Sequence, residues 1–519
     1  MIVFLTLLVG VVTVSYFYLR HKLNYWQDRG IPCLEPSLLY GNLDSVGQKV
    51  HNTINVQLVY ENFKIGHKVC GFYLLQTPRL IILDLDLIKN IMIKDFNNFV
   101  DRGIYNNAEV DPLSGHLFAI EGDKWRNLRN KLSPTFTSGK MKMMYPIIQS
   151  YSQGLVDLVQ QLSTDARNGF DIKNVCTRFT ADVIGSCGFG LECSALKDEN
   201  SEMLRMGEFF DIRDPLARFN FFFVNIFPNF AKRFNMKITP KFIIDFFMPM
   251  IRQTYDYRMN NDVNRNDFMS LLIQIIKNGK LNDDDGVSMT FNELAAQAFL
   301  FFVAGFETSS TTMTFALYEL AYRKEIQDKL RKEVIEIEKR HNGEITYEAI
   351  AEMTYLDQIV NETLRIYTPI GQLFRTCIND YTIPDTNIVI NSGMSVIIPV
   401  HAIHHDSRYY YDPEVFNPDR FSNEEVRKRP QYSFLPFGEN KYLLPFSLFQ
   451  SESVIFSGDG PRNCIGMRFG QMQVKLGIAT MIKNFQFSFH ENTTYPLWLD
   501  ARNIVVTSMH PIRLIAEKI

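Results

Sequence analysis

The sequence predicts one large domain built on long helices, with a single transmembrane helix in front of it. The chain has 519 residues, 46% of them hydrophobic, so it can bury one large core. No linker, repeat or low-complexity segment divides it after the first 40 residues. Residues 290–324 have the pattern of one very long helix, and Ile2–Leu19 is almost entirely apolar.

The apolar segment at the N-terminus is predicted to be a retained signal anchor. Its 18 residues are near the lower limit for crossing a bilayer, and Arg20, His21 and Lys22 follow at once. A cleavable signal peptide is the alternative, but it would have basic residues before the apolar run and small residues after it. Positive charge on the C-terminal side places the rest of the protein in the cytosol. We expect an anchor at 1–22, a hinge bearing Pro and Gly at 23–42, and a single domain at 43–519.

Charge and cysteine content exclude some classes of protein. The net charge of −3 argues against a general attraction to nucleic acid or to a membrane surface. The seven cysteines are scattered, without any Cys-x-x-Cys spacing, and are typical of reduced thiols facing the cytosol.

One cysteine stands in an unusual setting near the C-terminus. Gly458, Gly460 and Pro461 form an irregular loop that ends at Cys464, and the periodic run Met467–Ile482 predicts a helix directly after it. A thiol at a helix N-terminus is biased towards thiolate, the form that binds metals. No second cysteine has the spacing of a zinc or iron–sulfur site, so the thiol would be a lone ligand to a metal held by another group, such as haem iron. A buried structural cysteine is the alternative.

The long helix carries polar residues in an apolar setting. Thr290 and Glu293 form a capping box, and residues 290–324 would span about 50 Å as a helix. Glu307 and Thr308 lie near its middle, where an unpaired polar group is costly to bury. The structural explanation is that Thr308 bonds back to the carbonyl of Ala304. A second, shorter helix opens at Gly122 with Asp123 as its expected N-cap.

These residues resemble the motifs of one family. Asp459-Gly-Pro-Arg-Asn-Cys-Ile-Gly466 resembles the haem-binding loop of the cytochrome P-450 superfamily of haem-thiolate monooxygenases. Further motifs follow the family's order: Trp125-x-x-x-Arg129, Ala304-Gly-Phe-Glu-Thr-Ser309, Glu362-Thr-Leu-Arg365 and Phe416-Asn-Pro-Asp-Arg-Phe421. The resemblance covers essentially the whole chain, and residues 299–310 are similar to the insect microsomal group, family six.

The resemblance implies a mainly α fold with a smaller β-rich lobe, preceded by the transmembrane helix. It implies haem b as the cofactor and insertion of one atom of dioxygen into a lipophilic xenobiotic or endogenous lipid. Electrons would come from NADPH through a flavoprotein reductase, with cytochrome b5 as an additional partner, on the cytosolic side of the endoplasmic reticulum membrane. A haem-thiolate isomerase or dehydratase is the alternative enzyme, and a non-catalytic haem-binding product is the alternative outside enzymes.

The resemblance also assigns roles to individual residues. Cys464 would be the axial ligand to iron. The small residues Ala304 and Gly305 would leave space above the iron, and Glu307 and Thr308 would relay protons to the dioxygen bound there. The other expected cofactor contacts are Trp125, Arg129, Arg375, Phe437 and Arg462. Glu362, Arg365 and Arg420 would form a structural network behind the thiolate. The expected substrate pocket is lined by Phe118, Phe301, Ala304, Pro369, Ile370 and Leu373.

Two surfaces are expected to face partners. The aromatic clusters Phe219–Phe227 and Phe242–Met250 would lie near a loop that dips into the membrane, with ordinary core as the equal alternative. A basic face behind the thiolate would receive an acidic reductase, with a solvated charged face as the alternative. Its candidate contacts are Lys124, Arg126, Lys131, Lys140 and Arg468.

The haem-binding loop departs from the family's pattern. The family expects Pro-Phe-Gly to run straight into Asp-Gly-Pro-Arg-Asn-Cys, but residues 439–458 separate Pro436-Phe437-Gly438 from Asp459. Removing these 20 residues restores the motif without a seam. Gly-Glu and Ser-Gly at the edges can be encoded with splice-donor and splice-acceptor sequences, so we expect a retained intron and a functional protein without the insert. A surface loop is the alternative, although the insert is unusually apolar for one.

Overall fold

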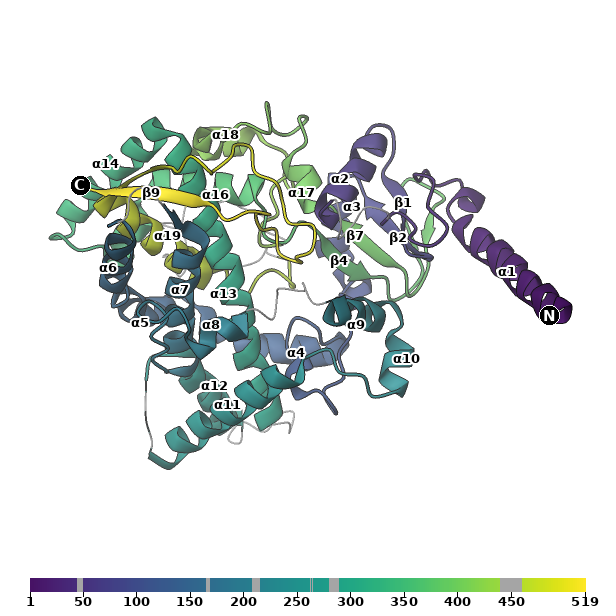
Figure 1. Cartoon of the computed structure of the whole chain (residues 1–519), viewed down its shortest axis with the longest axis horizontal. Helices are drawn as coiled ribbons and strands as arrows, with labels where there is room; N and C mark the ends of the chain where they lie inside the picture. The colour runs from purple at the N-terminus through teal and green to yellow at the C-terminus, as the bar shows by residue number, and fades with distance from the viewer. Residues whose placement is uncertain are drawn as a thin grey trace.

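The computed structural model describes residues 1–519 except 44–49, 165–168, 208–214, 262, 264, 280–288 and 439–459. Figure 1 shows a larger helical lobe, a smaller lobe built around a β-sheet, and helix α1 projecting away from both. The mainly α fold with a smaller β-rich lobe is as the sequence predicts. The 439–458 insert lies outside the described residues.

The helices account for most of the described chain. Their bounds are α1 Ile2–Leu23, α2 Asn52–Phe63, α3 Leu85–Lys89, α4 Gly122–Leu132, α5 Ser138–Gln149, α6 Ser152–Leu162, α7 Ile172–Ile184, α8 Glu202–Gly207, α9 Pro215–Ile226, α10 Pro228–Arg233, α11 Lys241–Asn261, α12 Phe268–Gly279, α13 Phe291–Tyr322, α14 Lys324–Arg340, α15 Tyr347–Glu352, α16 Thr354–Ile366, α17 Val400–His404, α18 Asn423–Lys428 and α19 Met467–Asn484.

The strands form three small sheets. Their bounds are β1 Val69–Leu74, β2 Thr77–Ile82, β3 Phe170–Asp171, β4 Leu373–Thr376, β5 Tyr381–Thr382, β6 Val389–Ile390, β7 Ser395–Ile398, β8 Phe485–Phe489 and β9 Arg513–Lys518. The largest sheet has the order β1-β2-β7-β4, with β2 and β7 parallel and the other neighbours antiparallel. The C-terminal tail contributes β9, which pairs with both β3 and β8.

Helix α13 is the centre of the helical lobe. The expected capping box is present at its start, where Thr290 and Glu293 satisfy each other's backbone N–H groups. Most of its side chains are buried, and it packs against α7, α16 and α19. A helix that is apolar on nearly all sides is expected inside a core, and α13 is the helix on which these three neighbours pack.

The start of α4 differs from the sequence-based expectation. Asp123 was expected to cap the helix, but no side chain of the preceding residue or of Asp123 caps it. Instead the N–H of Gly122 donates to Asp101 Oδ1 at 2.7 Å. A carboxylate from a distant segment therefore satisfies the first free N–H of the helix, which a local sequence pattern cannot reveal.

The connector after α1 is packed against the sheet rather than free. Trp26 is 2% exposed, and its indole N–H donates to the carbonyl of Phe72 at 3.2 Å. Tyr73 Oη donates to Leu23 O at 2.7 Å and accepts from Trp26 N. A Cβ on Gly71 would lie 2.4 Å from the Trp26 ring, so only glycine allows this close approach. The end of the anchor is therefore fixed to β1, and the expected hinge belongs structurally to the sheet lobe.

Candidate functional site

Cys464 lies in the loop that precedes α19. Its backbone N–H donates to the carbonyl of Phe437 at 2.8 Å, so Phe437 stays beside the thiol despite the insert between them. The side chain is accessible to solvent. Desolvation nevertheless raises the pKa of the Cys464 thiol, opposed by the Gly466 N–H and by the charges of Arg129 and Arg102. A thiol that is both accessible and surrounded by protein lines an internal recess.

The middle of α13 presents a second accessible surface inside the molecule. Ala304 is exposed and Thr308 is half-buried, whereas most of the helix is buried. Helix α19, which begins three residues after Cys464, holds this stretch: Gln473 Nε2 donates to Gly305 O at 3.0 Å. A Cβ on Gly470 would lie 3.8 Å from Ser309 Oγ. Helix α19, which follows the thiol loop, therefore packs on the stretch of α13 that carries Glu307 and Thr308.

Thr308 makes the back-bond that the structural explanation expected. Its hydroxyl donates to Ala304 O at 2.6 Å. Because a hydroxyl has one proton and two lone pairs, Thr308 in this rotamer can still accept a hydrogen bond but cannot give one. The bond thus orients the hydroxyl oxygen without excluding a chemical role.

Glu307 points to a partner that sequence reasoning did not find. Lys173 Nζ, at the first turn of α7, lies 2.8 Å from Glu307 Oε1 and also donates to Ser310 and Thr311. The Glu307 side chain is 13% exposed. The carboxylate therefore lies in direct contact with a basic side chain of α7, and no local pattern links the two residues because they are 134 positions apart.

Gly305 does not leave open space, contrary to expectation. A Cβ at this position would lie 2.5 Å from Ile184 Cδ1 of α7. The glycine therefore serves the close packing of α13 on α7, and Ala304 alone provides the accessible small side chain.

Most of the expected cofactor contacts gather around one acidic residue, Asp101, which the sequence analysis missed. The Arg462 guanidinium lies 4.2 Å from the centre of the Trp125 ring and 3.7 Å from Asp101 Oδ1. Arg129 donates to the side chain of Asn463, next to the thiol. The carbonyl of Asp101 accepts from Thr376 N at 2.7 Å, which brings the neighbouring Arg375 towards the same region. These three arginines come from three segments: the loop before α19, α4 and β4.

Arg102 is a further basic residue of this group that was not predicted. It donates to Arg462 O at 3.0 Å and to Phe118 O at 3.2 Å, and its guanidinium lies 4.1 Å from the Phe118 ring centre. Neither Asp101 nor Arg102 stands in a periodic or motif-like context, so tertiary contact is the only signal that identifies them.

The structural network of Glu362, Arg365 and Arg420 is present and buried. Arg365 pairs with Glu362 through two hydrogen bonds of 2.7 and 2.8 Å, and both side chains are fully buried. Arg420 Nε lies 3.4 Å from Glu362 Oε1, and Asn417 N donates to the same oxygen at 2.9 Å. Removing one partner of such a pair costs about 3–5 kcal/mol, because the other charge stays buried.

His404 connects this network to the thiol loop, and the sequence analysis missed it. Its carbonyl accepts from Arg365 at 2.9 Å, and its ring Nε2 accepts from Leu435 N at 2.8 Å. The other ring nitrogen lies 2.9 Å from Thr368 Oγ1, which fits a neutral ring with its proton on Nδ1. Desolvation holds the pKa of His404 well below its usual range. Two residues after Leu435, Phe437 accepts from Cys464.

The expected pocket residues are not all in one place. Phe118 is 43% exposed beside Arg102, and Ala304, Ile370 and Leu373 are accessible to differing degrees. Pro369 is buried, with its carbonyl bonded to Val506. Phe301 differs: its ring stacks on Phe268 at 4.5 Å. It also packs against Phe136 and Phe469. It belongs to the core between α12, α13 and α19, and we remove it from the proposed pocket.

The sequence is similar to known proteins along nearly its whole length. Residues 31–439 and 450–515 match the Cytochrome P450 family. The chain is 44% identical to "Probable cytochrome P450 6a21" of Drosophila melanogaster over 522 residues, covering 100% of this chain and 99% of that protein. It is 43% identical to "Cytochrome P450 6a9" and 41% identical to "Cytochrome P450 6a2" of the same organism. These alignments cover 99% and 100% of this chain, and the same shares of the two relatives.

Full-length identity above 40% agrees with an accessible thiol in the loop before α19, the helix that packs on the part of α13 carrying Glu307 and Thr308. The chain therefore belongs to the cytochrome P450 family, resembles its insect family-six members, and is a haem-dependent monooxygenase.

Proposed function

We propose that this protein oxidises lipophilic small molecules with dioxygen and with electrons from NADPH, delivered by a flavoprotein reductase. The observation that supports this most directly is the accessible thiol of Cys464 in the loop before α19, because α19 packs on the stretch of α13 between Gly305 and Ser309. Xenobiotics and endogenous lipids are both candidate substrates, and the catalytic domain faces the cytosol at the endoplasmic reticulum membrane.

The residues around the recess fit haem b. A single accessible thiol suits one axial position of an iron that the porphyrin already holds, and cationic side chains suit its two carboxylates. Cys464 would bind the iron, Phe437 would lie beside it, and the carboxylates would be met by Trp125, Arg129, Arg375 and Arg462, with Arg102 added to the predicted set. When bound, the haem supplies the binding and activation of dioxygen.

Proton delivery is assigned to Glu307 and Thr308. The Thr308 oxygen, oriented by its bond to Ala304, accepts a hydrogen bond from a protonated group in the recess. Glu307 relays protons from the α7 side, where Lys173 positions its side chain: it takes up a proton from water and then passes it towards Thr308. For each proton transferred, the carboxylate must exchange its contact with Lys173 for a water molecule.

The substrate pocket is proposed to use Phe118, Ala304, Pro369, Ile370 and Leu373. Phe118 and Leu373 come from segments that flank the arginine group, whereas Ala304 comes from α13. Accessible apolar side chains next to an accessible helix face provide the surface that a lipophilic substrate needs.

Two surfaces are proposed to bind partners. Lys124, Arg126 and Lys131 on α4 are exposed, while Lys140 and Arg468 are half-buried, so the α4 face is the part most available to an acidic reductase or to cytochrome b5. Helix α1 is apolar enough to cross a membrane. Exposed aromatic side chains on α9–α11 support a second membrane contact: Phe219, Phe227, Phe230, Phe234 and Phe242.

The function is tested with the purified chain, a microsomal reductase and a panel of lipophilic substrates. Product formation should require NADPH and dioxygen, whereas an isomerase or dehydratase would need neither. In Thr308→Ala the product formed per NADPH should fall by about tenfold or more, with hydrogen peroxide rising in its place, because the accepting oxygen is lost.

Thr314→Ala is the matched control for Thr308→Ala. Thr314 makes the same kind of back-bond in the same helix, to Ser310 at 2.7 Å, but is buried. Unchanged product yield per NADPH in Thr308→Ala, or an equal loss in Thr314→Ala, would contradict the proton-delivery role.

His404 is expected to position the thiol loop. His404→Ala removes the acceptor for Leu435 N–H, so the loop at Phe437 should shift and a fraction of the protein should show the inactive form of the reduced carbon-monoxide spectrum. His401→Ala is the control, because His401 lies on the same helix and packs its ring on His405. A full thiolate spectrum in His404→Ala at equal haem content would argue against the role.

The segment 439–458 is proposed to be absent from the functional protein. The family match leaves out residues 440–449, which lie within this segment, although it resumes at 450, and Gly438 and Asn463 already lie side by side. A chain without 439–458 should bind haem in higher yield than the full chain, whereas a glycine–serine linker of the same length should not. Equal haem content in all three, or a dominant transcript that contains the segment, would show that it is a tolerated loop.

A further inference from the structure

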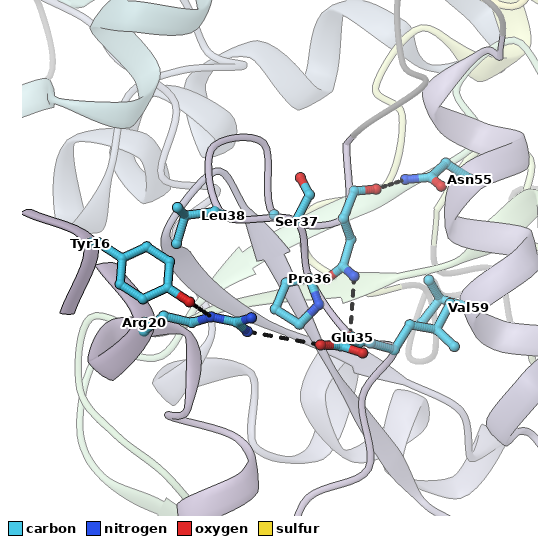
Figure 2. A pocket seen from close by; sticks show the side chains of 11 residues that line it. Tyr16, Arg20, Glu35, Pro36, Ser37, Leu38, Asn55 and Val59 are labelled. Carbon is cyan, nitrogen blue, oxygen red and sulfur yellow. Dashed lines mark hydrogen bonds and ion pairs between the residues drawn. The ribbon is translucent and has the colours of Figure 1, made fainter. Parts of the chain in front are cut away.

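A cavity of about 470 Å³ lies where the anchor helix meets the catalytic domain. Figure 2 shows Tyr16 and Arg20 of α1 on one side of it, Asn55 and Val59 of α2 on the other, and the connector residues Glu35, Pro36, Ser37 and Leu38 between them. None of these residues has a role in the chemistry assigned above.

The cavity has a fixed shape because both of its walls are tied to the sheet. Trp26 and Tyr73 hold the end of α1, as described above. Asn42 holds the connector: its side-chain amide donates to Leu34 O at 3.3 Å, and its side-chain oxygen accepts from Tyr73 N at 2.7 Å. Asn55 donates to the carbonyl of Asn42, which joins α2 to the same wall.

The cavity lies at the level of lipid headgroups. The apolar segment Ile2–Leu19 is about 27 Å long as a helix, close to the thickness of the hydrocarbon layer. Arg20 is the first charged residue after it, and Tyr16 lies one turn earlier on the same face. Aromatic and basic residues at this depth are typical of the membrane–water interface.

Two opposite charges face the cavity without closing on each other. Arg20 Nη1 and Glu35 Oε1 are 3.8 Å apart, which is too long for a hydrogen bond, and the Glu35 side chain is 82% exposed. A ligand with an anion and a cation of its own could therefore meet both. The lining also includes the apolar side chains of Leu34, Leu38 and Val59, which can contact the apolar part of such a ligand.

We propose that this cavity binds the headgroup of a zwitterionic phospholipid with a primary ammonium, as in phosphatidylethanolamine. The phosphate pairs with the Arg20 guanidinium, and the ammonium donates hydrogen bonds to the Glu35 carboxylate. Glu35 disfavours acidic lipids, and a trimethylated ammonium cannot donate to it. The inference rests on the proposed membrane anchoring by α1, and it makes the lipid a further contact between the anchor and the connector.

The test uses the full chain in vesicles of phosphatidylcholine with minor phosphatidylethanolamine or phosphatidylglycerol. After sedimentation the protein is extracted in mild detergent, and its retained lipid is measured by mass spectrometry. Phosphatidylethanolamine should be enriched about two- to fivefold over the bulk ratio, the range expected for an exposed charge pair. Glu35→Gln should return the ratio to that of the bulk, and Arg20→Gln should reduce retention of all three lipids.

Lys22→Gln is the matched control, because Lys22 lies at the same depth on α1 but outside the cavity lining. It should keep the enrichment. A bulk lipid ratio in the wild type, an unchanged enrichment in Glu35→Gln, or preference for phosphatidylglycerol would overturn the inference while leaving membrane anchoring intact. Failure of the chain to sediment with any vesicle would overturn the anchoring proposal and this inference together.

Discussion

The rest of the structure depends on holding one thiol at a fixed place inside the protein. Cys464 cannot be positioned by its own short loop, because a thiol makes weak hydrogen bonds and the loop is irregular. Instead, its backbone N–H donates to the carbonyl of Phe437, and the N–H of nearby Leu435 donates to the ring of His404. The carbonyl of His404 in turn accepts from Arg365, which is paired with Glu362. A buried ion pair thus acts at a distance on the thiol, through a path of short backbone contacts. This explains why a fully buried and costly charge pair is retained behind the site.

Positive charge predominates around the same site. Arg102 and Arg129 act electrostatically on the Cys464 thiol, Arg462 precedes it by two residues, and Asp101 is an acidic residue that meets Arg462. Such an arrangement favours an anionic ligand and lowers the pKa of the thiol against the desolvation that raises it. Binding of a carboxylate-bearing cofactor would relieve the crowding of positive charge, so cofactor binding and stability of this region are coupled.

Local patterns predicted the elements well, because each has a local cause. The capping box at Thr290 and Glu293 marked the start of α13, and the apolar periodicity after Cys464 marked α19. Residues whose importance comes only from tertiary contact were missed: Lys173, Asp101, Arg102 and His404 lie far along the chain from the groups they hold. Phe301 and Gly305 were expected to face the substrate side of α13, but Phe301 packs against Phe268 and Gly305 packs against Ile184. The sequence does not show which side of a buried helix faces a neighbouring helix. The cavity beside the anchor had no sequence signal, because three separate segments form it.

The central claim is that the sulfur of Cys464 is the protein ligand to the haem iron. The most direct measurement is the reduced carbon-monoxide difference spectrum of the wild type and of Cys464→Ser at equal haem content. The wild type should give the spectrum of a thiolate-ligated haem, and the variant should lose it together with NADPH-dependent product formation. A thiolate spectrum that survives in Cys464→Ser would show that another residue holds the iron.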